Sequence, residues 1–265
     1  MQKQCTLRIA TYNIWNNDEG QNTRAEKILQ ELHAVNADIV GLQEVTSEFY
    51  EQVLKRDKTY PYSCFYTYSG ENEGLAILSR LPIESEVFLH TSEERACSNA
   101  LNIVVGGNQL KISITNVHLP WDSVKKQEEQ IVAIDQFIHE QDADFFVLLG
   151  DFNGNMNSSV NRYLLGDQTI NGQESNLYWN DLQSGYCVRN GIPLTPTLDF
   201  INNPRWRGKE TISVPMVADR IYVMESWDDI DMKELSIFGT EVYQDTDMSA
   251  SDHYGIVAEL VFEKA

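Results

Sequence analysis

Cysteine, long apolar runs and linker-like segments are all scarce in this chain of 265 residues. No run approaches the roughly 18 apolar residues of a membrane span, which favours a cytoplasmic protein, or a secreted one if a signal peptide has been removed. No stretch rich in Pro, Gly or Ser divides the chain, so we expect one domain over residues 1–265, with its core at about 6–263. The four cysteines form no C-x-x-C pair, which argues against a zinc site or a disulfide scaffold: Cys5, Cys64, Cys97 and Cys187.

Basic residues are also scarce, because 20 Lys and Arg stand against 40 Asp and Glu and leave a formal net charge of −20. A protein that binds nucleic acid without sequence preference normally uses Lys and Arg to displace counterions from phosphates. The charge therefore disfavours extended duplex nucleic acid as a partner. It does not exclude a phosphate ligand, since a bound metal would offset charge locally and Arg205, Arg207 and Lys209 form a short basic segment.

The apolar pattern predicts many strands with helices between them. Helices are expected at residues 46–55 and 124–138, and after Thr23-Arg24-Ala25-Glu26, which has the form of a capping box. Gly106-Gly107-Asn108 predicts a hairpin turn. Strands are expected at residues 7–14, 38–42, 74–78, 83–89, 99–105, 110–117, 144–149, 219–223, 235–239 and 255–262.

This mixture of hairpins and helices predicts an α/β (α+β) fold, in which two mixed β-sheets pack face to face with helices outside. Residues 186–215 are the least regular part, rich in Pro, Asn, Gly, Arg and Trp. A loop of that length is uncommon unless it has a function. We therefore assign it to the rim of the active site.

Polar segments end several of the predicted strands, and Gly150-Asp151-Phe152-Asn153 is the most informative of them. An open α/β sheet binds its ligands where strands end and polar side chains converge. Five further segments end strands in the same manner: Thr11-Tyr12-Asn13, Leu42-Gln43-Glu44, Asn116-Val117-His118, Ala218-Asp219-Arg220 and Ser251-Asp252-His253. Together they predict one metal-dependent hydrolytic site.

These segments contain the parts that hydrolysis of a phosphate ester requires: a cation, an oriented water and a donor for the leaving oxygen. Glu44 is a hard oxygen ligand suited to Mg²⁺, and Asn13 adds a neutral oxygen or an amide donor. In Ser251-Asp252-His253, the Asp252 side chain can point to the metal and that of His253 to the scissile phosphate. We expect Asp219 to hold the His253 imidazole in one tautomer, which would raise the histidine pKa.

The six motifs, taken in order, resemble those of the endonuclease/exonuclease/phosphatase superfamily from Leu7 to Phe262. The resemblance implies a four-layer α/β sandwich, dependence on Mg²⁺ with Mn²⁺ as an alternative, and hydrolysis of a phosphodiester or phosphomonoester. It makes Glu44 the main metal ligand, with Asn13 beside it. It implies that Asp151 and Asn153 orient or deprotonate water and bind phosphate, while His253 with Asp219 supplies a second base or phosphate contact. His118 would stabilise phosphate or protonate the leaving group, and either Asp151 or His253 could take the proton.

The resemblance leaves the substrate open. At the position of His118, the chain resembles members like deoxyribonuclease I and the neutral sphingomyelinases, which also carry histidine. Abasic-site nucleases tend to carry tyrosine there. Phosphoinositide 5-phosphatases are the runner-up, because Pro215-Met216-Val217-Ala218-Asp219-Arg220 resembles one of their motifs but lacks its Trp-Cys pair. We expect the protein to be a monomer that binds a phosphate-ester substrate. Four residues are expected to contact this substrate: Arg95, Trp121, Asp199 and Trp206.

Each motif alone also has a structural explanation. Asp151 and Asn153 could cap the turn after their strand, and Glu44 could cap the helix that follows it. A binding or scaffold protein that kept the fold and lost activity would lack at least one catalytic group, and none is missing here. A calcineurin-like metallophosphatase would need Asp-x-His and Gly-Asn-His motifs, which the chain does not contain.

Overall fold

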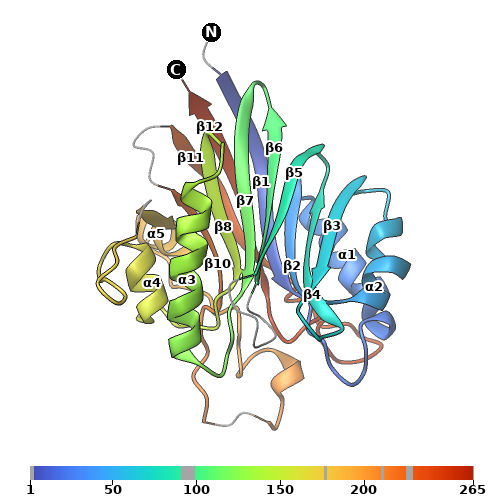
Figure 1. Ribbon diagram of the computed structural model, residues 1–265. Helices are drawn as coiled ribbons and strands as arrows, with labels where there is room; N and C mark the ends of the chain where they lie inside the picture. Colours follow the sequence, from blue (N-terminus) through green and yellow to red (C-terminus); the bar gives the residue numbers. More distant parts are fainter. Residues whose placement is uncertain (1–2, 91–98, 176–177, 210–211, 225–228, 265) are drawn as a thin grey trace.

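The computed structural model describes residues 3–90, 99–175, 178–209, 212–224 and 229–264, and these form two six-stranded sheets packed face to face (Figure 1). The first has the order β11 (Ile230–Phe238), β12 (Gly255–Lys264), β1 (Lys3–Asn13), β2 (Ile39–Thr46), β4 (Glu73–Ser79), β3 (Tyr62–Thr67). The second has the order β5 (Ile83–His90), β6 (Asn99–Gly107), β7 (Leu110–His118), β8 (Phe145–Asp151), β10 (Asp219–Met224), β9 (Trp179–Asp181).

Each sheet contains a parallel pair whose crossover connection includes a helix. β1 and β2 are parallel and are joined through α1 (Ala25–Val35), while β7 and β8 are parallel and are joined through α3 (Val124–His139). The outer face of the first sheet packs on α1 and α2 (Ser47–Gln52), and that of the second on α3 and α4 (Ser159–Leu164) (Figure 1). α5 (Leu182–Asn190) lies beside β10 and β11. The four layers confirm the predicted sandwich.

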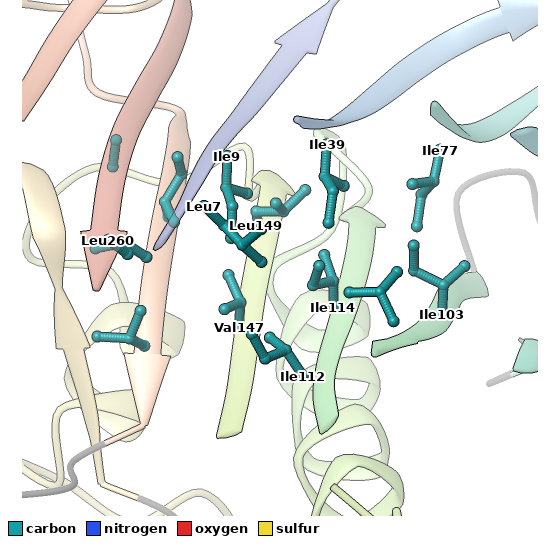
Figure 2. Close-up of a cluster of buried hydrophobic side chains, with 14 of the residues drawn as sticks. Leu7, Ile9, Ile39, Ile77, Ile103, Ile112, Ile114, Val147, Leu149 and Leu260 are labelled. Carbon is teal, nitrogen blue, oxygen red and sulfur yellow. The ribbon is translucent and has the colours of Figure 1, made fainter. Parts of the chain in front are cut away.

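The period of two along each strand produces three apolar layers. On β1, Leu7 and Ile9 face the other sheet, whereas Ala10 and Tyr12 face the helices. On β8, Val147 faces inward and Phe146 outward. Aliphatic side chains from both sheets meet in the central layer, as Figure 2 shows for Ile9, Ile39, Ile114 and Leu149, among others. The central layer holds the two sheets together.

The same inward-facing positions become polar at one end of the strands. On β7, every second residue from Ile112 onward faces inward and is buried. Ile112 and Ile114 come first along this face, and Asn116 and His118 follow them. On β8, Leu149 is followed by Asp151. The carboxyl ends of both parallel pairs lie at the same end of the sandwich, opposite the chain termini (Figure 1). The central layer is therefore apolar along most of its length and polar at this end.

Three local predictions located the right element but were wrong in detail. Thr23 does not cap α1, because its hydroxyl donates to the backbone oxygens of Glu19 and Gly20 and the helix begins at Ala25. The β6–β7 turn is made by Asn108 and Gln109, both with positive φ (50° and 67°), rather than by Gly106-Gly107-Asn108. The predicted helix at 46–55 is α2 followed by a 3-10 turn, Leu54–Arg56.

Four strands and α-helices of the described structure lie outside the predicted set: β3, β9, α4 and α5. The segment 186–215, expected to be irregular, begins inside α5 and contains a 3-10 turn, Pro204–Trp206. Among the described residues, no helix is long and apolar enough to cross a membrane.

Candidate functional site

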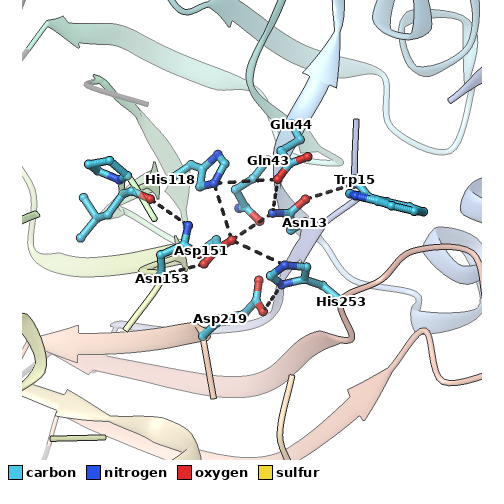
Figure 3. Close-up of polar contacts among 12 residues, drawn as sticks. Asn13, Trp15, Gln43, Glu44, His118, Asp151, Asn153, Asp219 and His253 are labelled. Atoms are coloured by element: carbon cyan, nitrogen blue, oxygen red, sulfur yellow. Dashed lines mark hydrogen bonds and ion pairs between the residues drawn. The ribbon is translucent and has the colours of Figure 1, made fainter. Parts of the chain in front are cut away.

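Asp151, the last residue of β8, lies at the centre of the polar end and is buried (Figure 3). Its Oδ2 accepts a hydrogen bond from Asn13 Nδ2 at 3.0 Å, and lies 3.6 Å from His118 Nε2 and 3.9 Å from His253 Nε2. Its Oδ1 accepts from the backbone N–H of Asn153 at 2.8 Å. One carboxylate thus connects groups from both sheets.

The glycine before Asp151 is required by the close approach of β7. Gly150 has a φ of 140°, which favours glycine, and a Cβ there would lie 2.0 Å from the backbone oxygen of Val117. The following Asn153 also has a positive φ (48°), and its Nδ2 donates to Leu119 O at 2.8 Å. The Gly-Asp-x-Asn sequence therefore turns the chain sharply while holding Asp151 against β7.

Glu44 reaches the same centre from the first sheet through a backbone irregularity. The pairing of β2 with β4 shifts register between Leu42 and Val45, and Glu44 itself has a φ of 59°. Bulges of this kind commonly re-aim side chains beside active sites. Glu44 Oε1 accepts from Asn13 Nδ2 at 3.0 Å and Oε2 accepts from the backbone N–H of Asn16 at 2.7 Å. Its carboxylate is partly exposed, with 19% of the side-chain area accessible.

Asn13 bridges these two carboxylates as a donor. Its Nδ2 serves both Glu44 and Asp151, and its Oδ1 accepts from the backbone N–H of Trp15 at 3.0 Å. Asn13 is fully buried at the end of β1. In this orientation, Asn13 fixes the separation between the carboxylates of Glu44 and Asp151.

Asp219 and His253 form a buried pair on the other side of Asp151. Asp219 begins β10, and its Oδ2 lies 2.8 Å from His253 Nδ1, which leaves Nε2 facing Asp151. The backbone N–H of Asp219 donates to Thr197 Oγ1. Burial alone would lower the pKa of His253, but the negative charges of Asp219 and Asp151 raise it well above its usual value. The pairing predicted from the sequence is present.

Asp252 is buried beside this pair. Burial, together with the charges of Glu44 and Asp151, raises the pKa of Asp252 to about 7, although the neighbouring His253 acts to lower it. Ser251 Oγ donates to the backbone oxygen of Asn13 at 2.7 Å and so ties this loop to β1. The carboxylates of Glu44, Asp151 and Asp252 thus lie close together with fewer positive charges than negative ones. A bound metal ion would reduce their mutual repulsion.

His118 approaches Asp151 from β7. Its Nε2 lies 3.6 Å from Asp151 Oδ2 and 3.9 Å from Glu44 Oε1, while Tyr68 Oη lies 3.2 Å from its Nδ1. Tyr68 is buried in the turn between β3 and β4. The sequence analysis missed this tyrosine, because no motif surrounds it and β3 itself was not predicted.

A buried polar network lies beneath these groups. Gln43 Nε2 donates to Thr11 Oγ1 at 3.0 Å and to Asn116 Oδ1 at 2.6 Å. Asn116 Nδ2 donates in turn to the backbone oxygens of Leu42 and Ala76 in the opposite sheet. These bonds between the sheets fix their relative position, while Gln43 Oε1 has no hydrogen-bond partner in the described structure.

Carboxylates and a histidine are close enough to hold a metal. Among the described residues, potential ligand atoms of Asp151, Asp219 and His253 all lie within 4.8 Å of one another. Glu44 shares the Asn13 Nδ2 donor with Asp151, and the charges of Glu44 and Asp151 both act to raise the pKa of Asp252, so the two predicted ligands adjoin this group. Within this group, Asp219 Oδ2 is already engaged with His253 Nδ1.

The predicted substrate contacts are dispersed. Arg95 lies outside the described residues. Asp199 is engaged in its own turn, because its carboxylate accepts from the backbone N–H groups of Ile201 and Asn202. Trp121 is 80% exposed. Trp206 donates from Nε1 to the backbone oxygen of Asp252 at 3.2 Å. Of the four, Trp206 alone has a described contact with a residue of the predicted site.

The fold and the cluster of carboxylates and histidines are those of a metal-dependent hydrolase. The sequence model of the endonuclease/exonuclease/phosphatase family matches residues 10–253, and the chain belongs to this family. Its members are metal-dependent hydrolases of phosphate esters, and this chain is an enzyme of that kind. No curated protein sequence matches the chain.

Solved structures share the fold at low sequence identity. D. rerio TDP2 in complex with single strand DNA product aligns with a TM-score of 0.78 and 18% identity, over 96% of this chain and 98% of that one. A family member from Bacteroides thetaiotaomicron aligns with a TM-score of 0.72 and 18% identity, over 98% and 99%. ANGEL2, a 2′,3′-cyclic phosphatase, in complex with adenosine-2′,3′-vanadate, aligns with a TM-score of 0.72 and 15% identity, over 98% and 96%. These likenesses establish the fold.

Proposed function

We propose that this protein is a Mg²⁺-dependent phosphoesterase that cleaves a phosphodiester or phosphomonoester by attack of water. The observation that carries the proposal is the convergence on Asp151 of side chains from three other strand ends and the loop before β12: Asn13, His118, Asp219 and His253. Each of these side chains comes from a different motif, yet their polar atoms lie within a few ångströms of one carboxylate. Capping of separate turns would not require such a convergence.

The chemistry of the donors fits a hard divalent cation. Mg²⁺ prefers carboxylate oxygens and keeps several waters, so Glu44, which is partly exposed, is the ligand we assign first, with Asp252 beside it. Asn13, predicted as a further ligand, turns its Nδ2 toward the carboxylates of Glu44 and Asp151 and its Oδ1 toward the backbone N–H of Trp15, so we assign it to holding those carboxylates in place. Mn²⁺ prefers similar oxygen ligands and would substitute. A cation held there would polarise a phosphoryl oxygen and offset the charge that develops on the phosphate.

The protein's own groups then have distinct tasks. Asp151 would orient the attacking water and accept its proton, because its Oδ2 is held by Asn13 and faces both histidines. His253, fixed through Nδ1 by Asp219, would present Nε2 to the phosphate. We assign His118 to the leaving oxygen and Asn153 to binding the phosphate. Buried donors at fixed positions stabilise developing charge without reorganising during the reaction.

Two classes of substrate are alternatives for this site. The structural neighbours bind a single strand DNA product in one case and a vanadate of adenosine in the other, which supports a nuclease or nucleotide substrate. The motif ending in Asp219-Arg220 supports an inositol-phosphate or phosphoinositide substrate. The net charge of −20 disfavours an extended duplex. A panel of sphingomyelin, inositol phosphates, sugar phosphates, plasmid DNA and oligonucleotides would separate these classes.

Hydrolysis of bis(p-nitrophenyl) phosphate tests the proposal. We expect wild-type activity with Mg²⁺ or Mn²⁺, loss with chelator, and a fall of at least about 10²-fold in an Asp151→Asn, His253→Gln double variant. The matched control is Asp167→Asn, His139→Gln, which makes the same changes at exposed positions. Equal rates for wild type and the catalytic double variant would indicate a non-catalytic binding or scaffold protein.

A further inference from the structure

Trp15, two residues after Asn13, has a backbone conformation that large side chains rarely adopt. Its φ is 57°, in the left-handed region. A bulky residue is strained in that region and stays there only when its surroundings hold it, and such residues cluster at active sites. Figure 3 places Trp15 beside Asn13, at the edge of the site. Its contacts show what holds this conformation and what the conformation does for the site.

The left-handed turn directs two consecutive backbone N–H groups at the site. The N–H of Trp15 donates to Asn13 Oδ1 at 3.0 Å, and the N–H of Asn16 donates to Glu44 Oε2 at 2.7 Å. The first bond leaves Asn13 Nδ2 directed at Glu44 Oε1 and at Asp151. The second bond holds the oxygen of Glu44 that Asn13 does not bind. Both carboxylate oxygens of Glu44 are therefore oriented by the segment that contains Trp15.

One buried amide joins the backbones of Trp15 and Glu44. Gln21 Nε2 donates to the backbone oxygens of both residues, and Gln21 Oε1 accepts from the N–H of Thr46 at 2.9 Å. Glu44 also has a positive φ, so two left-handed residues adjoin the same buried side chain. A displacement of Trp15 would thus reach Glu44 through its backbone as well as through its carboxylate.

Three cationic side chains surround the indole of Trp15. The guanidinium carbons of Arg24 and Arg205 lie 5.4 and 5.5 Å from the ring centroid, and Lys209 Nζ lies 5.8 Å from it. A cation within about 6 Å of the face of a tryptophan ring is attracted by the ring electrons. Arg24 also donates to the backbone oxygen of Trp15. The ring and the backbone of Trp15 are therefore held by the same groups.

The two arginines connect Trp15 to the other side of the site. Both are buried. Arg205 Nε donates to the backbone oxygen of Ser249 at 2.9 Å, and Arg24 Nη1 donates to that of Ala250. These oxygens belong to the loop before β12, which carries the Ser-Asp-His motif. Trp15 is thus fixed between the end of β1 and that loop.

The two buried guanidinium groups would repel each other without their surroundings. Burial, together with the charge of Arg205, lowers the pKa of Arg24. Glu19 accepts from Arg205 at 2.7 Å and lies 3.9 Å from Arg24 Nε, so its carboxylate offsets part of the repulsion. The ring face of Trp15 offsets a further part. The arginines and the indole therefore stabilise one another.

We propose that Trp15 is a positioning residue that holds Glu44 in the geometry for binding a divalent cation. The arginines fix the ring, the fixed ring keeps the backbone left-handed, and that backbone directs the N–H of Asn16 at Glu44. That Glu44 binds the cation rests on the proposed function. Groups that orient a ligand from behind typically change metal affinity or activity by roughly 10- to 100-fold when they are removed.

A titration with Mn²⁺, followed by the EPR signal of the free ion, tests this role without any need for turnover. Trp15→Leu removes the ring and should weaken Mn²⁺ binding by roughly tenfold or more. Trp15→Phe keeps a ring face for the arginines and should bind Mn²⁺ with an affinity between those of Trp15→Leu and wild type. Arg205→Met leaves the indole and removes one cation, so it should weaken binding by about 2- to 5-fold.

The matched control is Trp179→Leu, which removes a buried indole from the layer beneath α3. It should lower the melting temperature and leave the Mn²⁺ affinity of the folded protein unchanged. An equal loss of affinity in this control would make the effect of Trp15 a general loss of stability and overturn the proposal.

Equal Mn²⁺ affinities of wild type and Trp15→Leu would also overturn it. If Trp15→Leu does not fold, unchanged affinities in both Trp15→Phe and Arg205→Met would do the same. Weaker Mn²⁺ binding by the variants, with no hydrolysis of bis(p-nitrophenyl) phosphate by wild type, would remove the proposed function and leave the positioning role intact. Absence of Mn²⁺ binding to wild type would remove both.

Discussion

The central layer between the two sheets contains an aliphatic region and a polar region built on the same strands. Ile112 and Ile114 belong to the first, and Asn116 and His118, on the same face of β7, belong to the second. The aliphatic region gains free energy from burial alone. The polar region loses free energy wherever a buried group lacks a partner: Gln43 Nε2 is bonded to Thr11 and Asn116, whereas Gln43 Oε1 and Asp219 Oδ1 have no hydrogen-bond partner in the described structure.

This difference separates stability from chemistry along each strand. Substitutions in the aliphatic region should change the free energy of unfolding with little effect on the rate per folded molecule. Substitutions among the groups around Asp151 should lower the rate per folded molecule with little effect on the free energy of unfolding, provided that no buried charge loses its partner. Four substitutions test this separation, in order of decreasing expected effect.

The largest effect is expected for His253→Gln. The amide can still donate to Asp219 but cannot exchange a proton at the position of Nε2, so kcat should fall by about 10²- to 10⁴-fold. The melting temperature should fall by much less than the activity, although Gln removes the positive charge beside buried Asp219. Steady-state kinetics and thermal unfolding of the same preparation would measure both, with the exposed His139→Ala as control. A melting temperature that falls in step with activity would point to a structural histidine.

Ile112→Ala should show the opposite behaviour. Ile112 is fully buried between the sheets, and truncation of such a side chain costs about 2–5 kcal/mol in the free energy of unfolding. Urea unfolding would measure the loss, and KM and kcat per folded molecule should stay near their wild-type values. The exposed Val188→Ala should be nearly neutral in both assays. A large fall in kcat for Ile112→Ala would show that the two regions are coupled.

Glu44→Gln should act on the metal. It removes a formal charge from the expected first ligand, so the Mg²⁺ concentration at half-maximal rate should rise by at least about tenfold, as for other changes that weaken a metal site. Saturating Mg²⁺ should restore part of the rate. The control is Glu48→Gln, a change at a solvent-facing residue of α2. An unchanged Mg²⁺ titration would remove Glu44 from the ligand set.

Tyr68→Phe should have the smallest effect. It deletes one hydrogen bond to His118 Nδ1, and such bonds contribute about 0.5–1.5 kcal/mol, which corresponds to roughly a 2- to 10-fold fall in kcat. KM should be unchanged, since Tyr68 lies behind His118. The exposed Tyr178→Phe is the control. A rise in KM without a change in kcat would indicate that Tyr68 contacts the substrate instead.

The strand ends of the site could be predicted because their signal is local. Apolar runs that stop at Asn13, His118 and Asp151 reveal where buried strands meet solvent. The period of two then places alternate residues on one face. Because the motifs also matched a family in order, the layers of the fold followed from the sequence as well.

The remaining features depend on contacts between distant segments. The left-handed conformation of Glu44 arises from a register shift between β2 and β4, which the sequence around Glu44 does not reveal. Tyr68 reaches His118 across fifty positions of the chain. The short strand β9 and the helix α5 depend on packing beside β10 more than on their own periodicity. The intrinsic secondary-structure preferences of the residues predict such elements least well, because packing against neighbours decides them.

The most direct test of the account is the position of bound Mn²⁺, located by its anomalous scattering in a crystal of the wild-type protein. The account predicts one site with a Glu44 carboxylate oxygen at about 2.2 Å, close to Asp151 and with Asp219 still bonded to His253. A metal ligated by Asp219 and His253, with Glu44 uninvolved, would contradict it.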